Sequence, residues 1–218
     1  MLKVDLHVHT KYSDGDSLER IIYYARRCNL NGLAITDHNT IKGALSIAKL
    51  TRDLIIIPGI ELKTDVGHVL LLGVKEKPSK IMDYIELYEW SMENSIIVIL
   101  AHPVATLGRT LSRIRVLERY KPHAIEVLNS TYPLYSVATK LSEFIAKSLG
   151  LSGVAGSDAH RAYQVGLCYT LINSNPEVED VLESIRRGRV KPLGSPTPLP
   201  MRLELMMGFL SDFFRKEG

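Results

Sequence analysis

The sequence predicts a single α/β domain in which strands and helices alternate and close into a small barrel. Short apolar runs alternate with longer segments of helical periodicity along most of the 218 residues, which is the pattern of repeated strand–helix–strand units. Histidines and carboxylates follow the ends of several of these runs, as expected where functional groups gather at the carboxyl ends of barrel strands. An open, doubly wound sheet is the alternative architecture for the same pattern.

The predicted strands are short, apolar and rich in β-branched residues or leucine. The run at 96–100 is apolar without interruption, as expected of a strand that is buried on both faces. The run at 54–57 is expected to end at Pro58 and Gly59. In chain order the predicted strands are 2–5, 33–36, 54–57, 69–74, 96–100, 124–128, 152–155 and 168–171.

The predicted helices have apolar residues three and four positions apart and recognisable start or stop signals. Asn39 and Thr40 are expected to cap the second helix, and Ser79 the third. Gly150 and Gly188 stop the last two, in the role that glycine often has at helix C-termini. In chain order the predicted helices are 16–28, 40–50, 79–93, 111–120, 134–149 and 177–187.

The chain changes character after residue 193. Residues 195–200 alternate proline with other residues, which predicts a stiff linker, and 201–216 has a broad apolar face. We therefore expect residues 1–193 to form the catalytic barrel and 194–218 to form a linker and a C-terminal helix that packs on the barrel. A homodimer contact through this helix is the alternative, and a helix on a membrane surface is disfavoured because its polar face carries few basic residues.

Composition narrows the classes of function. The hydrophobic content of 45% suits one domain with a substantial core. A net charge of +3 is too small to indicate nucleic-acid binding by itself, although it permits an anionic substrate. Cys28 and Cys168 are far apart, so we expect neither a disulfide framework nor a thiolate metal site, and a cytoplasmic location is the expectation. The sequence predicts no signal peptide and no membrane partner.

Six of the seven histidines lie in short clusters with acidic residues or glycine. His7 and His9 are two positions apart, so in a strand both imidazoles point to the same side and can reach one metal ion. Asp158 and His160 repeat this spacing near the other end of the chain, and Glu61 is a carboxylate able to bridge two cations. Mixed imidazoles and carboxylates are the ligands of Zn, Mn and Fe, which predicts a multinuclear, hydrolytic metal centre. The other candidate ligands are Asp14, His38, His68 and His102.

Several of these residues have an alternative, structural interpretation. Asp14 precedes glycine and is typical of a turn, although its nearness to His9 favours a ligand role. Asp37 either belongs to a turn or orients a neighbouring ligand. His68 opens a strand and is either a ligand or structural. His123 lies in a loop and is expected to be structural.

The clusters together resemble the signature of the PHP (polymerase and histidinol phosphatase) superfamily. The resemblance covers about residues 1–193 and implies a distorted (β/α)7 TIM-like barrel with up to three metal ions in a cleft at the carboxyl ends of the strands. The Ser-Asp-Gly segment resembles the branch that acts on nucleotides or short oligonucleotides. In order, the matching segments are Asp-Leu-His-Val-His-Thr, Tyr-Ser-Asp-Gly, Ile-Thr-Asp-His-Asn-Thr, Gly-Ile-Glu, Ala-His-Pro and Gly-Ser-Asp-Ala-His.

The resemblance also implies a role for each candidate ligand and a cofactor of two or three divalent ions, Zn, Mn or Fe. The first ion would be held by His7, His9, Glu61 and Asp158; the second by Glu61, His102 and His68; and the third by Asp14, His38 and His160. Asn129 matches a position near the site. The implied activity is a phosphoesterase that attacks phosphorus with a metal-activated hydroxide.

The expected substrate is a phosphorylated small molecule, a nucleotide or an oligonucleotide. Arg161 is the preferred contact for its phosphate, and Lys63, Arg109 and Arg113 are the other candidates. The chain has no visible inserted capping domain, which predicts an open site. Alternatives are a histidinol-phosphate phosphatase, which Asp14 in place of a histidine disfavours, and a non-catalytic RNA-binding scaffold, which would be expected to lose ligands.

Overall fold

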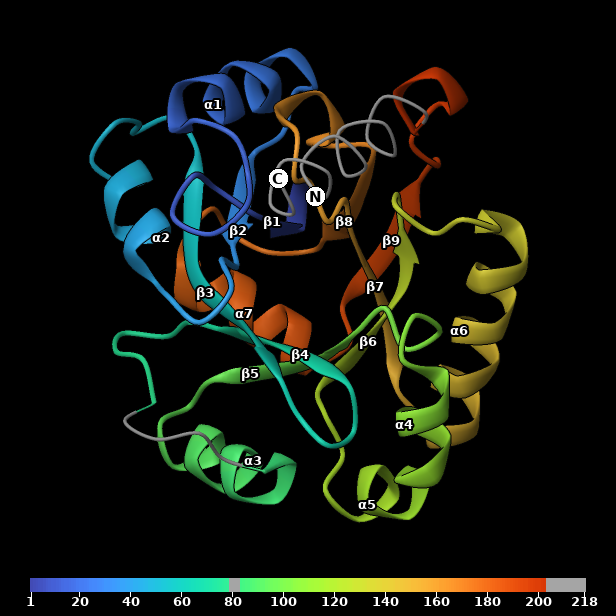
Figure 1. The fold of residues 1–218 in the computed structure, drawn as a ribbon. Coiled ribbons are helices and arrows are strands. Elements are labelled where there is room, and N and C mark those ends of the chain that lie inside the picture. Colours follow the sequence, from blue (N-terminus) through green and yellow to red (C-terminus); the bar gives the residue numbers. More distant parts are fainter. Residues whose placement is uncertain (79–82, 203–218) are drawn as a thin grey trace, which may run out of the picture.

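Within the described part of the chain, nine strands form one sheet that curls almost into a closed barrel (Figure 1). The computed structural model describes residues 1–78 and 83–202. The strand order is β7-β6-β5-β4-β3-β2-β1-β8-β9, and β7 and β9, the two edges of this sheet, lie beside each other. The strands are β1 Leu2–Val8, β2 Gly32–Ile35, β3 Ile55–Lys63, β4 His68–Leu72, β5 Ile97–Ala101, β6 Ala124–Asn129, β7 Ser152–Gly156, β8 Cys168–Ile172 and β9 Val190–Gly194.

The predicted fold class, a distorted TIM-like barrel, is confirmed, and the distortion has a clear origin. Strands β4 and β8 run antiparallel to both of their neighbours, whereas the other strands run parallel to one another. Strand β9 was not predicted, and it contains Pro192, a residue type that is rare inside a sheet. Its place at the edge of the sheet explains the exception, since a proline nitrogen there need not donate to a neighbour.

Two strands extend beyond their predicted ends. Strand β1 continues through His7 to Val8, and β3 continues through Pro58 to Lys63. The proline is tolerated because β3 changes partner there: it pairs with β2 up to Pro58 and with β4 from Gly59 onward. The carbonyl of Pro58 accepts hydrogen bonds from the backbone N–H groups that follow β4.

The helices follow the predicted order with three local differences. Helix α2 begins after Ile41, because Asn39 adopts a left-handed φ of +56° and cannot be the cap. The helix predicted over 111–120 is two short helices that meet at Arg113. Ser79 lies outside the described residues, and Asp83 caps α3. The helices are α1 Leu18–Arg27, α2 Lys42–Ile47, α3 Tyr84–Glu93, α4 Leu107–Ser112, α5 Ile114–Arg119, α6 Tyr135–Leu149 and α7 Val178–Arg186, with a 3₁₀ turn at Ala162–Gln164.

Helix α7 closes the amino-terminal end of the barrel. Its buried Val181 and Ile185 pack against side chains at the start of the parallel strands, among them Val4, Ile57 and Ile97. Figure 1 shows this helix behind the centre of the ring of strands. The carboxyl ends of the strands therefore form the opposite end, which carries the polar cluster.

The segment after β9 packs on the barrel by backbone hydrogen bonds. Ser195 N donates to Leu167 O, Thr197 N donates to Ser130 O, and Thr197 is buried. The expected helix over 201–216 lies outside the described residues except for its first two positions. Of the helices formed by residues 1–78 and 83–202, none combines the length and apolar character needed to cross a bilayer.

Candidate metal centre

Strand β1 delivers the first two imidazoles of the cluster. His7 lies near the end of the strand and His9 just after it, both buried. Their Nε2 atoms are 3.1 Å apart, as the two-residue spacing predicts. Each Nε2 also lies 3.3 Å from the same oxygen, Oε2 of Glu61.

Glu61 is the centre of the cluster. It extends from β3 and is 2% exposed, so its charge must be balanced by neighbouring groups. Oε2 lies within 3.3 Å of three imidazole nitrogens, and Oε1 within 3.1 Å of two others. The first three belong to His7, His9 and His38, and the other two to His68 and His102. The two oxygens thus face two separate groups of nitrogens, which is the arrangement of a bridging carboxylate.

The antiparallel direction of β4 explains how His68 reaches this site although it opens a strand. The first residue of β4 lies at the end of the barrel where the parallel strands finish, opposite Lys63 on one side and Ala101 on the other. Its Nδ1 lies 2.8 Å from Glu61 Oε1.

Two candidate ligands have left-handed backbone conformations within two residues of a strand end. His102 follows β5 with φ +26°, and Asp158 follows β7 with φ +54°. Such conformations are costly for residues other than glycine and are concentrated at functional sites. They turn both side chains back toward the cluster, where Asp158 Oδ1 lies 3.5 Å from His7 Nε2 and 3.3 Å from His9 Nε2.

Asp14 organises a second, more exposed part of the cluster. Its carboxylate lies 3.2 Å from His160 Nε2, 3.6 Å from His38 Nε2 and 3.7 Å from His9 Nδ1. The loop after β1 carries it there, with Lys11 N donating to Asp16 O. The structure thus brings a residue with turn-like sequence next to three imidazoles.

The structure brings all nine predicted ligands into four overlapping groups, in each of which the donor atoms lie within 4.8 Å of one another. The donor set fits a divalent metal, because each group combines imidazole nitrogens with a carboxylate oxygen. The Nδ1 atoms of His9 and His102 are buried and have no hydrogen-bond partner among the described residues. The groups are His7–His9–Glu61, His7–His102–Asp158, Glu61–His68–His102 and His9–Asp14–His38–His160.

The charges in the cluster are strongly coupled. Burial raises the pKa of Glu61 and of Asp158, but the surrounding histidines lower both further, so each pKa lies well below its ordinary value. Burial lowers the pKa of His9, but Asp158 and Glu61 raise it to about 9. The pKa of His7 is likewise raised, by Asp158, Glu126 and Glu61 against the effect of burial. Protons on imidazoles therefore balance the carboxylates in the metal-free protein, and a divalent cation would replace them.

Glu126 supports the cluster from behind, and sequence reasoning assigned it no role. Its Oε1 lies 3.0 Å from His7 Nδ1, and its Oε2 accepts hydrogen bonds from His102 N and from Asn129 Nδ2. Asn129 Nδ2 also donates to Asp158 Oδ2. The available signal was a glutamate inside the apolar strand 124–128, where a buried charge needs a partner.

Among the described residues, the Asp37 carboxylate forms no hydrogen bond or ion pair with a histidine. It is buried, and it accepts hydrogen bonds from Thr10 N, Thr10 Oγ1 and Ser13 Oγ. It therefore fixes the loop that carries Asp14. Its predicted role in orienting a neighbouring ligand is thus an indirect one in this structure.

The remaining predicted residues lie around the cluster or apart from it. Arg161 directly follows His160 and is exposed. His123 lies apart from the cluster, and its Nδ1 accepts a hydrogen bond from Val98 N, as expected of a structural histidine. Arg113 is paired with Asp65. Lys63 and Arg109 line a cavity beside His68 and His102.

Comparisons with known proteins found two matching family models. A family model described as PHP domain matches residues 5–100, and one described as PHP-associated matches residues 138–190. The uncharacterized protein MJ1587 of Methanocaldococcus jannaschii is 32% identical over 124 residues, which cover 50% of this chain and 72% of that protein.

Solved structures show a similar fold. A two-domain protein from Bacteroides vulgatus, containing a predicted PHP-like metal-dependent phosphoesterase, has a TM-score of 0.75 at 17% identity and covers 89% of this chain. This chain spans 65% of its length. PsfC from Pseudomonas syringae has a TM-score of 0.71 at 22% identity, with 99% of this chain and 98% of PsfC covered.

Proposed function

This chain belongs to the PHP superfamily, a family of metal-dependent phosphoesterases, and on that premise we propose that it hydrolyses phosphate esters of nucleotides or short oligonucleotides with two or three bound divalent ions. The observation that carries this proposal is Glu61, whose two oxygens face separate groups of imidazoles. A single buried carboxylate between two groups of nitrogens suits a pair of cations that share one ligand. Zn, Mn and Fe all accept these donors.

The residues would divide between the ions as the donor groups suggest. His7, His9, Glu61 and Asp158 would hold one ion, and Glu61, His68 and His102 a second. Asp14, His38 and His160, with His9 close by, would hold a third. When bound, such ions lower the pKa of water and neutralise phosphate oxygens.

The other side chains of the site hold this arrangement in place. Glu126 fixes the orientation of the His7 ring, and Asn129 Nδ2 and Thr131 Oγ1 hold Asp158 by its second oxygen. Asp37 positions the loop of Asp14 through Thr10 and Ser13. We assign to Arg161, exposed beside His160, a contact with the phosphate of the substrate.

Two other functions remain as alternatives. A histidinol-phosphate-type phosphomonoesterase would use the same ions, and the position of Asp14 beside three imidazoles is where a further histidine would be expected in such an enzyme. A non-catalytic RNA-binding scaffold is disfavoured because all nine candidate ligands are present and grouped.

The proposal includes a reducing, cytoplasmic setting, which the free thiols of Cys28 and Cys168 support. It also includes the C-terminal helix expected over residues 201–216, packed on the barrel, with a homodimer contact as the alternative. Arg202 marks where this helix would depart, because its guanidinium donates to Thr197 O and Pro133 O. Sedimentation of the full chain and of a chain that ends at Arg202 separates the two arrangements.

The first experiment is hydrolysis by the Mn-loaded protein, with a chelator-treated control, of p-nitrophenyl phosphate and of a 5′-labelled short RNA. We expect metal-dependent turnover, and loss of that turnover in His7→Ala. Cleavage of the RNA supports a nuclease, and turnover of the monoester alone supports a small-molecule phosphatase. Bound metal without turnover of either substrate, or full activity of His7→Ala, contradicts the proposal.

A further inference from the structure

A cavity of about 540 Å³ lies beside the metal-binding cluster, between the β3–β4 hairpin and α4. Its wall consists of Lys63, His68, His102 and residues 105–109. His68 and His102 also belong to the donor group around Glu61, so the cavity adjoins the proposed reaction site directly. Small-ligand sites typically have volumes of about 300–1,000 Å³, and this cavity falls within that range.

The wall carries two cationic side chains and no acidic one. Lys63 and Arg109 are exposed, and neither forms an ion pair with any residue in the ranges 1–78 and 83–202. Arg113, one helical turn after Arg109, is by contrast neutralised by Asp65. The two cations of the wall are therefore available to an anionic ligand.

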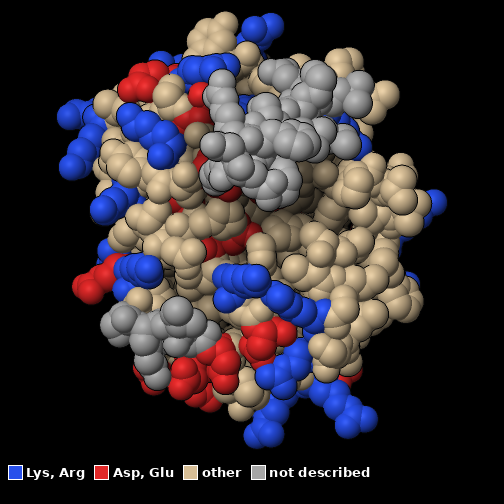
Figure 2. All heavy atoms as spheres, in the orientation of Figure 1, with Lys and Arg blue, Asp and Glu red and all other residues tan. Residues whose placement is uncertain are grey.

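The two cations approach the cavity from different elements. Lys63 ends β3 and lies directly opposite His68 in the β3–β4 pair, while Arg109 projects from α4. Figure 2 shows Lys and Arg side chains gathered over this hairpin and helix, next to a recess in which acidic side chains are visible. An anion between Lys63 and Arg109 would thus lie at the edge of the metal-binding cluster.

Two residues of the cavity wall leave room beside these cations because they have little or no side chain. Ala105 and Gly108 lie in it, and a Cβ added at Gly108 would meet no atom within 4 Å. The wall contains no tyrosine, phenylalanine or tryptophan, so it offers no large aromatic face for a nucleobase. Recognition there would rest on charge.

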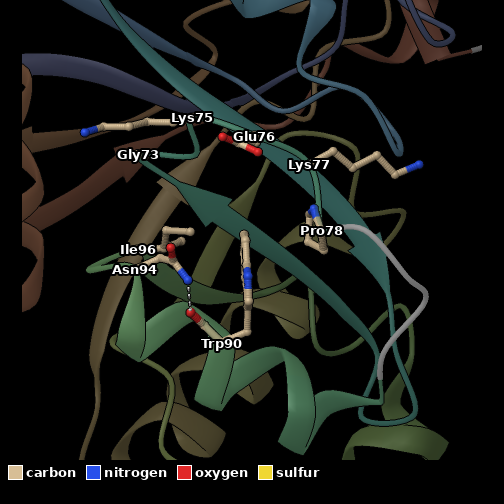
Figure 3. A pocket seen from close by; sticks show the side chains of 8 residues that line it. All are labelled: Gly73, Lys75, Glu76, Lys77, Pro78, Trp90, Asn94 and Ile96. Atoms are coloured by element: carbon tan, nitrogen blue, oxygen red, sulfur yellow. Dashed lines mark hydrogen bonds between the residues drawn. The ribbon is translucent and has the colours of Figure 1, made fainter.

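Of the other cavities, the one lined by Trp90 lacks this combination. It has a volume of about 420 Å³ and surrounds Trp90 at the opposite end of the barrel. Figure 3 shows that the side chains of Lys75 and Lys77 extend away from Trp90 in different directions. Its cations therefore do not converge on one ligand.

We propose that the cavity lined by Lys63 and Arg109 is a second anionic subsite, which holds a further phosphate group of a substrate whose scissile phosphate lies at the Glu61 cluster. This inference rests on the proposed function. Phosphate oxygens accept charge-assisted hydrogen bonds from lysine and arginine, which are stronger than neutral ones. A substrate with two phosphate groups occupies both places, whereas one with a single phosphate leaves the subsite unused.

A matched pair of substrates tests the subsite: thymidine 5′-monophosphate and thymidine 3′,5′-bisphosphate, which differ by one phosphate group. With the Mn-loaded protein we expect a KM about tenfold lower for the bisphosphate, which corresponds to about 1.4 kcal/mol. Arg109→Ala and Lys63→Ala should each raise KM for the bisphosphate several-fold more than KM for the monophosphate. Gly108→Phe should do the same without changing charge, because the ring fills the cavity.

Arg115→Ala is the control, because Arg115 is exposed on α5 and lies outside the cavity wall. It removes the same charge and should leave the ratio of the two KM values unchanged. Equal KM values in the unaltered protein, or equal increases for both substrates in Arg109→Ala and Gly108→Phe, overturn the subsite alone. Turnover of neither substrate by the metal-loaded protein overturns the proposed function as well.

Discussion

Glu126 and His7 form a buried pair that joins β6 to β1 across 119 positions of the chain, with Glu126 Oε1 3.0 Å from His7 Nδ1. The opposite ring nitrogen of His7 faces Glu61. A carboxylate on one nitrogen fixes the tautomer and the orientation in which the other nitrogen is presented to a metal ion. Glu126 therefore positions His7, a candidate metal ligand, and is not itself a candidate ligand.

Glu126→Gln should weaken metal binding and lower kcat/KM by about 10–100-fold while the barrel stays folded, because the amide keeps the shape but loses the charge that favours the correct tautomer. Metal titration by calorimetry and circular dichroism measure the two effects. Glu118→Gln, at an exposed position on α5, is the matched control. Unchanged metal affinity in Glu126→Gln would contradict this role.

Asp158→Asn should abolish turnover with a smaller effect on folding than other replacements would have. Asparagine tolerates the left-handed conformation of this position, φ +54°, better than most residues and can keep the hydrogen bond from Asn129 after rotation of its amide. It lacks the negative charge that faces His7 and His9. Thermal unfolding and activity at saturating Mn separate the two effects, and substantial turnover by Asp158→Asn would remove Asp158 from the site.

The stability of the metal-free protein and its affinity for metal should change with pH in opposite directions above about pH 6.5. The pKa of His9 is raised from 6.5 to about 9, so its contribution to metal-free stability is complete below pH 6.5 and is lost as the pH rises toward 9. Glu61 and Asp158 have lowered pKa values, so their contribution is present above their ordinary values of 4.5 and 3.8 and is lost as the pH falls further. We expect the Tm of the metal-free protein to be highest between these limits.

Metal binding should instead become tighter as the pH rises from 6 to about 9, because each ion displaces protons from imidazoles. Calorimetry in buffers of different ionisation enthalpy measures the protons released. Metal affinity that does not depend on pH over this range would show that the histidines are not the ligands.

Gly156→Ala should destabilise the fold by about 1–3 kcal/mol, the usual cost of overpacking. A Cβ there would lie 2.4 Å from His7 Cβ and 2.8 Å from Glu126 Oε1, so β7 could no longer approach β1. Gly108→Ala is the control: it enters open space within α4, where alanine is favoured over glycine by about 0.5–1 kcal/mol. Urea unfolding compares the two variants, and equal stabilities would show that the close approach at Gly156 is not required.

Much of the fold follows from local sequence patterns. The continuous apolar run of β5 identifies a strand, and α1 begins close to its predicted start, where Ser17 caps the helix by accepting a hydrogen bond from Arg20 N. Strand β9 and the passage of β3 through Pro58 could not be predicted in this way. Both depend on the neighbouring strand: an edge position in the first case and a change of partner in the second.

The sequence by itself determined which side chains could bind metal, because clusters such as His7 with His9, and Asp158 with His160, are encoded by short spacing along the chain. Only the tertiary structure decided which of these side chains contact one another. Glu61 contacts imidazoles from four separate segments, and Glu126 on β6 contacts His7 on β1. These contacts arise from barrel closure and from the antiparallel direction of β4, which are set by packing of the whole sheet, so the local sequence does not identify the partner of each residue.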